Sequence, residues 1–369
     1  MANFTDIKIE PDYNALKNNI LRKGSPRRVH FMDLFQDQEI KDLITSRFEL
    51  DKGLDKNDRY FNYTLEIAIQ KFLGYDIVSG VLEPQLYFPH TILDNRTSFQ
   101  APDTTLEEGQ ARSIRHWSNE HDGPIQTWED FENYPWPDPD KMDVSSLEWA
   151  DKCLDPAMRI YLPCSAIYEF SSQLIGYEQL CYKLIDNPDL VDAVISKMGE
   201  LRLRQAEIYC DFDCVGMLFG GDDFGYKTGL LISRDFLTQK VFPWYKKIVD
   251  LAHSKGKLFI LHSCGNLKSI MDDLIDFVGI DGKQSYEDVI TPVTEAKLRY
   301  GDRIAVIGGM DMDFMCTANE QQIRKRVRET LDICMPGGGY CMGLGNTVAN
   351  YIPLDNYLAM LDESRRYSV

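Results

Sequence analysis

Long hydrophobic segments are missing from this sequence of 369 residues. A transmembrane helix needs about 18 or more consecutive apolar residues, and no such run occurs, so we expect none. Internal repeats and low-complexity tracts are also absent, and 25 glycines with 16 prolines are too few for a fibrous chain. The hydrophobic fraction of 44% is that of a globular protein and excludes a disordered one.

Positive charge is scarce. The chain has 40 Lys and Arg residues against 58 Asp and Glu residues, which gives a net charge of −18. This argues against nucleic acid or an anionic membrane surface as the main partner. The N-terminal segment MANFTDIKIEPDYN is polar and lacks the features of a signal peptide. The nine cysteines are odd in number and several stand in apolar runs, so we expect reduced thiols and a cytoplasmic protein.

Strands and helices alternate along most of the chain. Short apolar runs, each followed by a helical pattern or a turn signal, predict eight strands, around residues 30, 77, 161, 217, 259, 280, 306 and 341. Strands that are apolar throughout are typical of a parallel sheet covered on both faces. We therefore predict a single α/β domain over 1–369, a (β/α)8 TIM barrel, with an open sheet as the alternative. Residues 85–150, rich in Pro, Asp and aromatics, are predicted to form a long excursion after the second strand that covers the C-terminal face.

Polar residues gather where the predicted strands end, which is where a barrel carries its chemistry. His262 and Cys264 follow the fifth strand one residue apart, and imidazole with thiolate favours zinc over magnesium or calcium. A buried histidine beside a buried cysteine is the structural alternative. The other candidates at strand ends are Asp222, Asp223, Glu287, Asp311 and Asn346.

Several segments resemble the uroporphyrinogen decarboxylase superfamily. They are HSCGNLKSIMDDLIDFVGIDG, GGMD, GGGYCMGLGNTVANYIPLDNY and, near the N-terminus, DYNALKNNILRKGSPRRV. The resemblance is clear over about residues 200–369 and weaker over 10–200. It implies a (β/α)8 barrel and one of two activities: the decarboxylation of a tetrapyrrole, or zinc-dependent methyl transfer that works with a corrinoid protein.

The resemblance favours the methyltransferase branch. The RQAGR motif of true decarboxylases is absent, YDIVSGVLEP stands where they have an SDI-like segment, and Gly345-Asn346-Thr347 replaces their GHG motif. The methyltransferases carry His-x-Cys and a third ligand cysteine, whose position falls on Asn346 here. Their methionine synthase relatives use a glutamate after the sixth strand, which implies Glu287 as the third ligand, with Cys341 in reserve.

The predicted metal ligands are therefore His262, Cys264 and Glu287, with Asn346 expected at the cofactor and Asp222, Asp223 and Asp311 expected to handle protons in one cavity. The structural alternatives are a core position for Cys341, a helix-start position for Glu287, and helix-start or supporting positions for Asp222 and Asp223. The expected reaction moves a methyl group from a small O- or N-methyl compound to a corrinoid protein or a thiol. A tetrapyrrole lyase and a non-catalytic corrinoid- or porphyrin-binding barrel are the alternatives, and a homodimer is left open.

Overall fold

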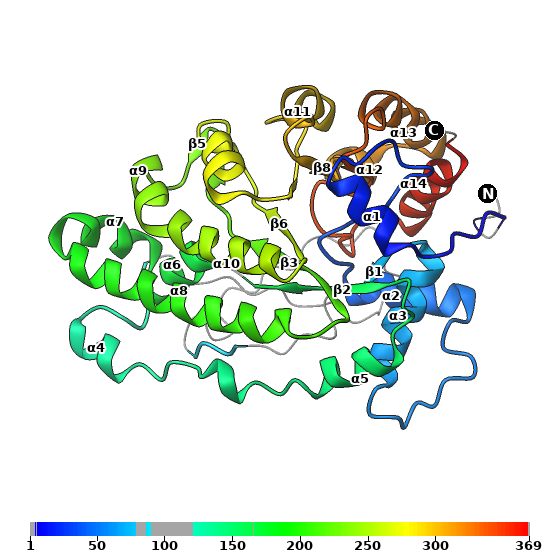
Figure 1. Cartoon of the computed structure of the whole chain (residues 1–369). Coiled ribbons are helices and arrows are strands. Elements are labelled where there is room, and N and C mark those ends of the chain that lie inside the picture. Colours follow the sequence, from blue (N-terminus) through cyan, green and yellow to red (C-terminus); the bar gives the residue numbers. More distant parts are fainter. Residues whose placement is uncertain (1–3, 5, 79–85, 90–120, 165, 368–369) are drawn as a thin grey trace.

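The computed structural model describes residues 4, 6–78, 86–89, 121–164 and 166–367. A curled, seven-stranded parallel sheet lies at its centre, in the order β1-β2-β3-β6-β7-β8-β9 (Figure 1). The strands are β1 Ile77–Val78, β2 Arg159–Pro163, β3 Val215–Gly221, β6 Leu258–His262, β7 Gly282–Gln284, β8 Ala305–Ile307 and β9 Tyr340–Cys341. A short antiparallel hairpin, β4 Gly225–Tyr226 and β5 Gly229–Leu230, follows β3. All seven sheet strands coincide with predicted ones.

The first predicted strand, around residue 30, forms no strand ladder in the described part of the chain but only isolated parallel bridges, one of them between Gln36 and Val348. Phe31 pairs in parallel with Met342, just after β9. Among the described residues no backbone ladder joins this first segment to β1, and side chains make the link instead. The buried carboxylate of Asp76, directly before β1, accepts hydrogen bonds from Arg28 and from Nδ1 of His30, the latter at 2.7 Å. The predicted TIM-barrel-like fold is thus confirmed, with a side-chain closure in place of one strand pair.

Helices surround this sheet and pack against its strands, as α10 does on β6 and α11 on β8, in each case the strand that follows the helix in the chain. The side chain of Ser233 caps the helical stretch that begins with α9, because it accepts a hydrogen bond from N of Phe236 at 3.2 Å. The helices are α1 Tyr13–Ile20, α2 Gln38–Phe48, α3 Phe61–Leu73, α4 Trp128–Asn133, η1 Pro139–Lys141, α5 Ser145–Cys153, α6 Ile167–Ile175, α7 Tyr177–Asp186, α8 Pro188–Cys210, α9 Arg234–Phe236, η2 Leu237–Val241, α10 Phe242–Ser254, η3 Asp273–Val278, α11 Val293–Tyr300, α12 Met312–Thr317, α13 Glu320–Cys334 and α14 Leu354–Arg366.

Much of the predicted 85–150 excursion, residues 85 and 90–120, lies outside the described residues. The described part from 121 onward packs along α6 and α8 (Figure 1). N of Ile125 donates to O of Leu174 at 2.9 Å, and Arg204 on α8 binds Asp140 at 2.6 Å. Residues 86–89 lie at the C-terminal end of the sheet, where Leu86 lines a cavity beside His262.

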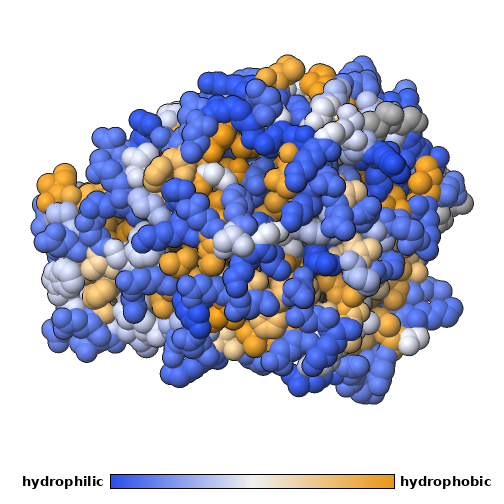
Figure 2. All heavy atoms as spheres, viewed as in Figure 1, coloured by the Kyte–Doolittle hydropathy of each residue, from blue (hydrophilic) through white to orange (hydrophobic). Residues whose placement is uncertain are grey.

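Hydrophilic side chains cover most of the face seen in Figure 2, with smaller hydrophobic areas between them. None of the helices in the described part of the chain combines the length and the apolar character needed to cross a membrane.

Candidate metal centre

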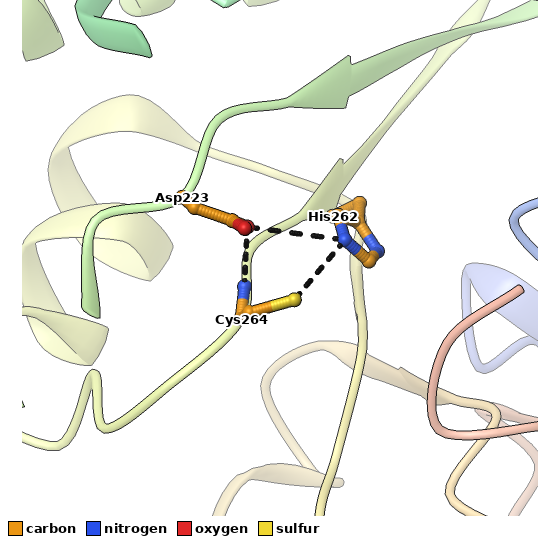
Figure 3. Close-up of side chains that lie close together, drawn as sticks. All are labelled: Asp223, His262 and Cys264. Carbon is orange, nitrogen blue, oxygen red and sulfur yellow. Dashed lines mark hydrogen bonds and ion pairs between the residues drawn. The ribbon is translucent and has the colours of Figure 1, made fainter. Parts of the chain in front are cut away.

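Two neighbouring strands end side by side at the candidate site. β3 and β6 are paired in parallel, with Gly221 opposite His262. N of Asp222 continues this ladder by donating to O of His262 at 3.1 Å. Because paired strands lie about 4.8 Å apart, the residues that follow β3 come next to the end of β6. Asp223 and Cys264 therefore approach His262 from two different loops (Figure 3).

Asp223, His262 and Cys264 form a compact group whose ligand atoms all lie within 4.8 Å of one another. Sγ of Cys264 is 3.4 Å from Nε2 of His262, and Oδ1 of Asp223 is 3.9 Å from the same nitrogen. In a tetrahedral zinc site, with Zn–N of ~2.1 Å and Zn–S of ~2.3 Å, the nitrogen and sulfur ligands stand roughly 3.5 Å apart. The spacing of His262 and Cys264 thus matches that of a zinc site, and the carboxylate of Asp223 lies close enough to be drawn in as the third ligand.

Gln284, at the end of β7, orients the imidazole ring of His262. Nδ1–H of His262 donates to Oε1 of Gln284, and Nε2 of Gln284 donates to O of Leu344 at 3.3 Å. This tautomer leaves the lone pair of His262 on Nε2, the atom that faces Asp223 and Cys264. Burial lowers the pKa of His262, so the ring is neutral at neutral pH, which is the form that binds a metal.

The loop that carries Cys264 is held through its backbone. N of Cys264 donates to Oδ1 of Asp223 at 2.7 Å. Gly265 follows with a φ of +83°, and a Cβ atom there would lie 2.2 Å from the backbone of Gly225 in β4. This close approach requires glycine and leaves the loop no room to shift.

Two polar side chains from other loops donate toward the sulfur of Cys264. Nδ2 of Asn346 lies 3.4 Å from Sγ and Oγ of Ser285 lies 3.6 Å from it. The pKa of the Cys264 thiol is raised to about 12, chiefly by burial and next by the charge of Asp223. A divalent cation would supply the charge that balances a thiolate here. Asn346, predicted to contact a cofactor, thus touches a candidate ligand.

Glu287, the third predicted ligand, lies outside this group. The structure brings Asp223 to His262 and Cys264 instead. After β7 the chain turns at Ser285, with a φ of +88°, so Ser285 rather than Glu287 faces Cys264. Glu287 lines a separate, smaller pocket. Cys341 is fully buried in β9 and also lies outside the group, so the reserve ligand takes the core position given as its structural alternative.

The three aspartates predicted to handle protons take different positions. Asp222 is fully buried, and its carboxylate accepts from two backbone N–H groups at the start of α6, at 2.9 and 2.7 Å, and from the hydroxyl of Tyr245 at 2.8 Å. Burial raises the pKa of Asp222 to about 7. Asp311 caps α12 by accepting from N of Phe314 at 3.1 Å, and it does not line the cavity at His262. Asp222 therefore anchors α6, and Asp223 joins the candidate metal group.

A cavity of about 470 Å³ opens beside His262 at the C-terminal end of the sheet. Two of its lining residues, Glu169 and Arg202, were not singled out from the sequence. Burial, followed by the charges of neighbouring aspartates, raises the pKa of Glu169 to about 8, so this carboxyl group is protonated at neutral pH. Arg202, Gln205 and Tyr209 follow one another at i, i+3 and i+7 on α8, a spacing that marks one helix face and could have identified them.

The donor set fits zinc chemically as well as geometrically. Imidazole, thiolate and carboxylate are ligands that zinc accepts, whereas magnesium and calcium prefer oxygen alone. Three protein ligands leave one coordination position free, which is the arrangement of a catalytic zinc. His262 and Asp223 both line the cavity, so a zinc ion held by this group would lie at the cavity wall.

Comparison with known proteins points to one family. The family profile described as Uroporphyrinogen decarboxylase (URO-D) matches residues 120–367, more than half of the chain. A uroporphyrinogen decarboxylase of Methylibium petroleiphilum is 30% identical over 105 residues, 28% of this chain and 26% of that protein. One from Coxiella burnetii is 24% identical over 191 residues, half of each chain. The chain thus spans only a quarter to a half of the length of these curated relatives.

Among solved structures, a methyltransferase from Methanosarcina mazei superposes with a TM-score of 0.70. The superposition covers 97% of this chain and 99% of that one, at 16% sequence identity, and therefore shows a shared fold. Together with the family profile, which covers the strand ends that carry Asp223, His262 and Cys264, this leads to one assignment: the chain belongs to the uroporphyrinogen decarboxylase (URO-D) family.

Proposed function

We propose that this protein is a zinc-dependent methyltransferase that moves a methyl group between a small O- or N-methyl compound and a corrinoid protein or a thiol. The observation that carries the proposal is the group of Asp223, His262 and Cys264, whose ligand atoms lie within 4.8 Å of one another beside a cavity of about 470 Å³. The structural likeness to a methyltransferase supports it through the fold alone.

The residues of the group would hold the ion through Nε2 of His262, Sγ of Cys264 and a carboxylate oxygen of Asp223. Zinc acts as a Lewis acid, and here it would stabilise the oxygen or nitrogen from which the methyl group departs. Two negative ligands would balance its double charge. A neutral site of this kind accepts an uncharged ether or amine group of the substrate without the repulsion that a strongly negative site would impose on a developing anion.

Proton supply falls to Glu169 in this proposal. When a methyl group leaves, the electron pair of its bond stays on the oxygen or nitrogen, which then takes up a proton. Glu169 is protonated at neutral pH, lines the same cavity and lies directly beside the aspartates that raise its pKa. Because its pKa of about 8 is close to the working pH, it can act as a general acid.

The methyl acceptor is proposed to be the Co(I) corrinoid of a partner protein. The corrinoid would supply the nucleophile that takes up the methyl group, and the cavity beside His262 and Asp223 is where this chain would present the methylated substrate to it. A small thiol is the second acceptor that the same chemistry allows.

Metal analysis of the purified protein tests the proposal directly. We expect about one zinc per chain, because one three-ligand site is proposed. Cys264→Ala and Asp223→Asn should lose the ion, whereas Glu287→Gln and the matched cysteine control Cys153→Ala, at an exposed position, should keep it. Methyl transfer is followed by the change in absorption as free cob(I)alamin becomes methylcobalamin in the presence of methyl ethers and methylamines.

Three outcomes would contradict the proposal or its ligand assignment. If the wild-type protein holds no zinc and does not take it up from solution, the ligand assignment is wrong. If Glu287→Gln strips the ion while Asp223→Asn keeps it, the third ligand is Glu287. A metal-free protein that decarboxylates a tetrapyrrole would favour the activity named in its curated relatives.

A further inference from the structure

Arg202 is a buried cation in the wall of the candidate active-site cavity. It stands on α8, only 6% of its surface is exposed, and it lines the cavity together with Asp223 and His262. Its guanidinium lies 4.9 Å from the ring centroid of Phe170 and 5.2 Å from that of Phe88. These aromatic contacts fix the plane of the guanidinium, but they do not neutralise its charge.

The hydrogen bonds of Arg202 are incomplete. Nη1 donates to Oε1 of Gln205 at 2.8 Å, and the buried Nε has no hydrogen-bond partner within the described part of the chain. Gln205 is itself a neutral residue, held in turn by its amide group, which donates to the hydroxyl of Tyr209 at 2.7 Å. A guanidinium offers five N–H donors, so this one retains capacity for an oxyanion.

The carboxylates that line the same cavity do not pair with Arg202. No ion pair joins it to a carboxylate among the residues that the structure describes, and the side-chain acceptor it binds there is the neutral Gln205. Asp222 is occupied by two backbone N–H groups of α6 and by Tyr245. Glu169 lines the same cavity without forming an ion pair with Arg202 in the described residues, and Asp223 belongs to the candidate metal group. Burying a charge without a counter-charge costs roughly several kcal/mol of folding free energy. An anionic ligand would supply the missing counter-charge.

We infer that Arg202 is the anion-recognition residue of the cavity, and that the substrate is a small organic anion whose carboxylate or sulfonate oxygens bind its guanidinium. That the substrate also carries a methyl ether or methylamine group rests on the proposed function. The anion site itself does not depend on that function. We expect the body of this substrate to be largely apolar, because Leu34, Leu86, Pro163 and Phe170 also line the cavity. A cavity of about 470 Å³ accommodates a molecule with one aromatic ring.

Binding of three matched probes tests this inference: 4-methoxybenzoate, 4-methoxybenzenesulfonate and methoxybenzene, which is uncharged. Affinities are measured by isothermal titration with the wild-type protein. A buried, charge-assisted hydrogen-bond pair predicts that the two anions bind ~10–100-fold more tightly than methoxybenzene. Arg202→Met should remove this preference, and Arg202→Lys should restore part of it because it keeps the charge without the planar fork.

The control variant is Arg204→Gln. Arg204 stands two residues further along α8, is exposed, and pairs with Asp140 and Glu207, so its loss should leave the preference for anions unchanged. Thermal unfolding of each variant shows whether it is folded. If Arg202→Met does not fold, the wild-type preference and Arg202→Lys still decide the matter.

The same titrations with Cys264→Ala separate this inference from the proposed function. The anion preference should persist in that variant even though the zinc ligand is gone, because Arg202 binds without the metal. Equal affinity of the wild-type protein for all three probes, or an anion preference that survives in Arg202→Met, would overturn the inference and leave the zinc assignment untouched. Loss of zinc without loss of anion preference is the expected pattern for Cys264→Ala.

Discussion

Replacement of Gln284 by methionine tests whether the orientation of His262 serves metal binding. The side chain of Gln284 accepts from Nδ1–H of His262 and donates to O of Leu344 at 3.3 Å. Methionine has a similar length but can form neither bond. Outer hydrogen bonds of this kind are typically worth 10–100-fold in metal affinity, so the zinc dissociation constant should rise by roughly this factor, or about 1.4–2.8 kcal/mol.

The assay is competition for zinc between the protein and a chromophoric chelator at pH 7.5, with Gln321→Met as the matched control at an exposed position on α13. Stability must be measured separately, since unpaired buried groups at His262 and Leu344 are expected to cost about 1–3 kcal/mol each in the unfolding free energy. A folded Gln284→Met protein with the wild-type zinc affinity would refute the argument that the glutamine sets the tautomer of a metal ligand.

Three further outcomes are expected. Asp76→Asn should lower the unfolding free energy in urea by roughly 3–5 kcal/mol, because it breaks the buried pairing that closes the barrel, while zinc content stays unchanged. Burial raises the pKa of Asp222 from 3.8 to about 7, so the stability that this group contributes at low pH is lost as pH rises toward 7. Asp222→Asn should therefore flatten the decline of urea midpoints between pH 5 and 7, and an unchanged slope would contradict the assigned burial. Gly265→Ala should weaken zinc binding ~10-fold, because the added Cβ meets the backbone of Gly225. The control Gly256→Ala, in open space at a φ of +68°, should cost only about 1 kcal/mol of stability. Equal zinc affinity in both variants would show that the loop is not rigid.

The arrangement of the strands could be predicted from the sequence because each buried strand is a short apolar run. Leu258–His262 and Ala305–Ile307 are buried throughout, so their residues are apolar or small almost without exception, and turn signals delimit them. The first strand is different. Around Phe31 only isolated bridges form, and the polar residues Arg28 and His30 make the connection to Asp76. An apolar run cannot indicate that a strand pair is replaced by an ion pair.

Two of the three residues of the candidate site, His262 and Cys264, could be placed together from the sequence. His262 and Cys264 stand at the end of one strand, so their proximity follows from chain order alone. The third residue had to come from a neighbouring strand, and β6 has two neighbours, β3 and β7. Each is followed within three residues by a candidate acidic ligand, Asp223 after β3 and Glu287 after β7. The choice depends on how the chain turns after β7, and the left-handed backbone at Ser285, a residue type that gives no signal for this conformation, decides it.

The adjacent pair Asp222 and Asp223 shows why residue type alone does not assign a role at a strand end. N of Asp222 still belongs to the β3–β6 ladder, and successive side chains of an extended segment point to opposite sides. One carboxylate is therefore directed to the start of α6, where backbone N–H groups bind it, and the next is directed to His262 and Cys264. The first fixes a helix that carries Glu169 to the cavity, and the second supplies a candidate ligand. Two identical side chains thus divide a structural and a chemical task, and the division follows from the alternation of the strand rather than from the chemistry of aspartate.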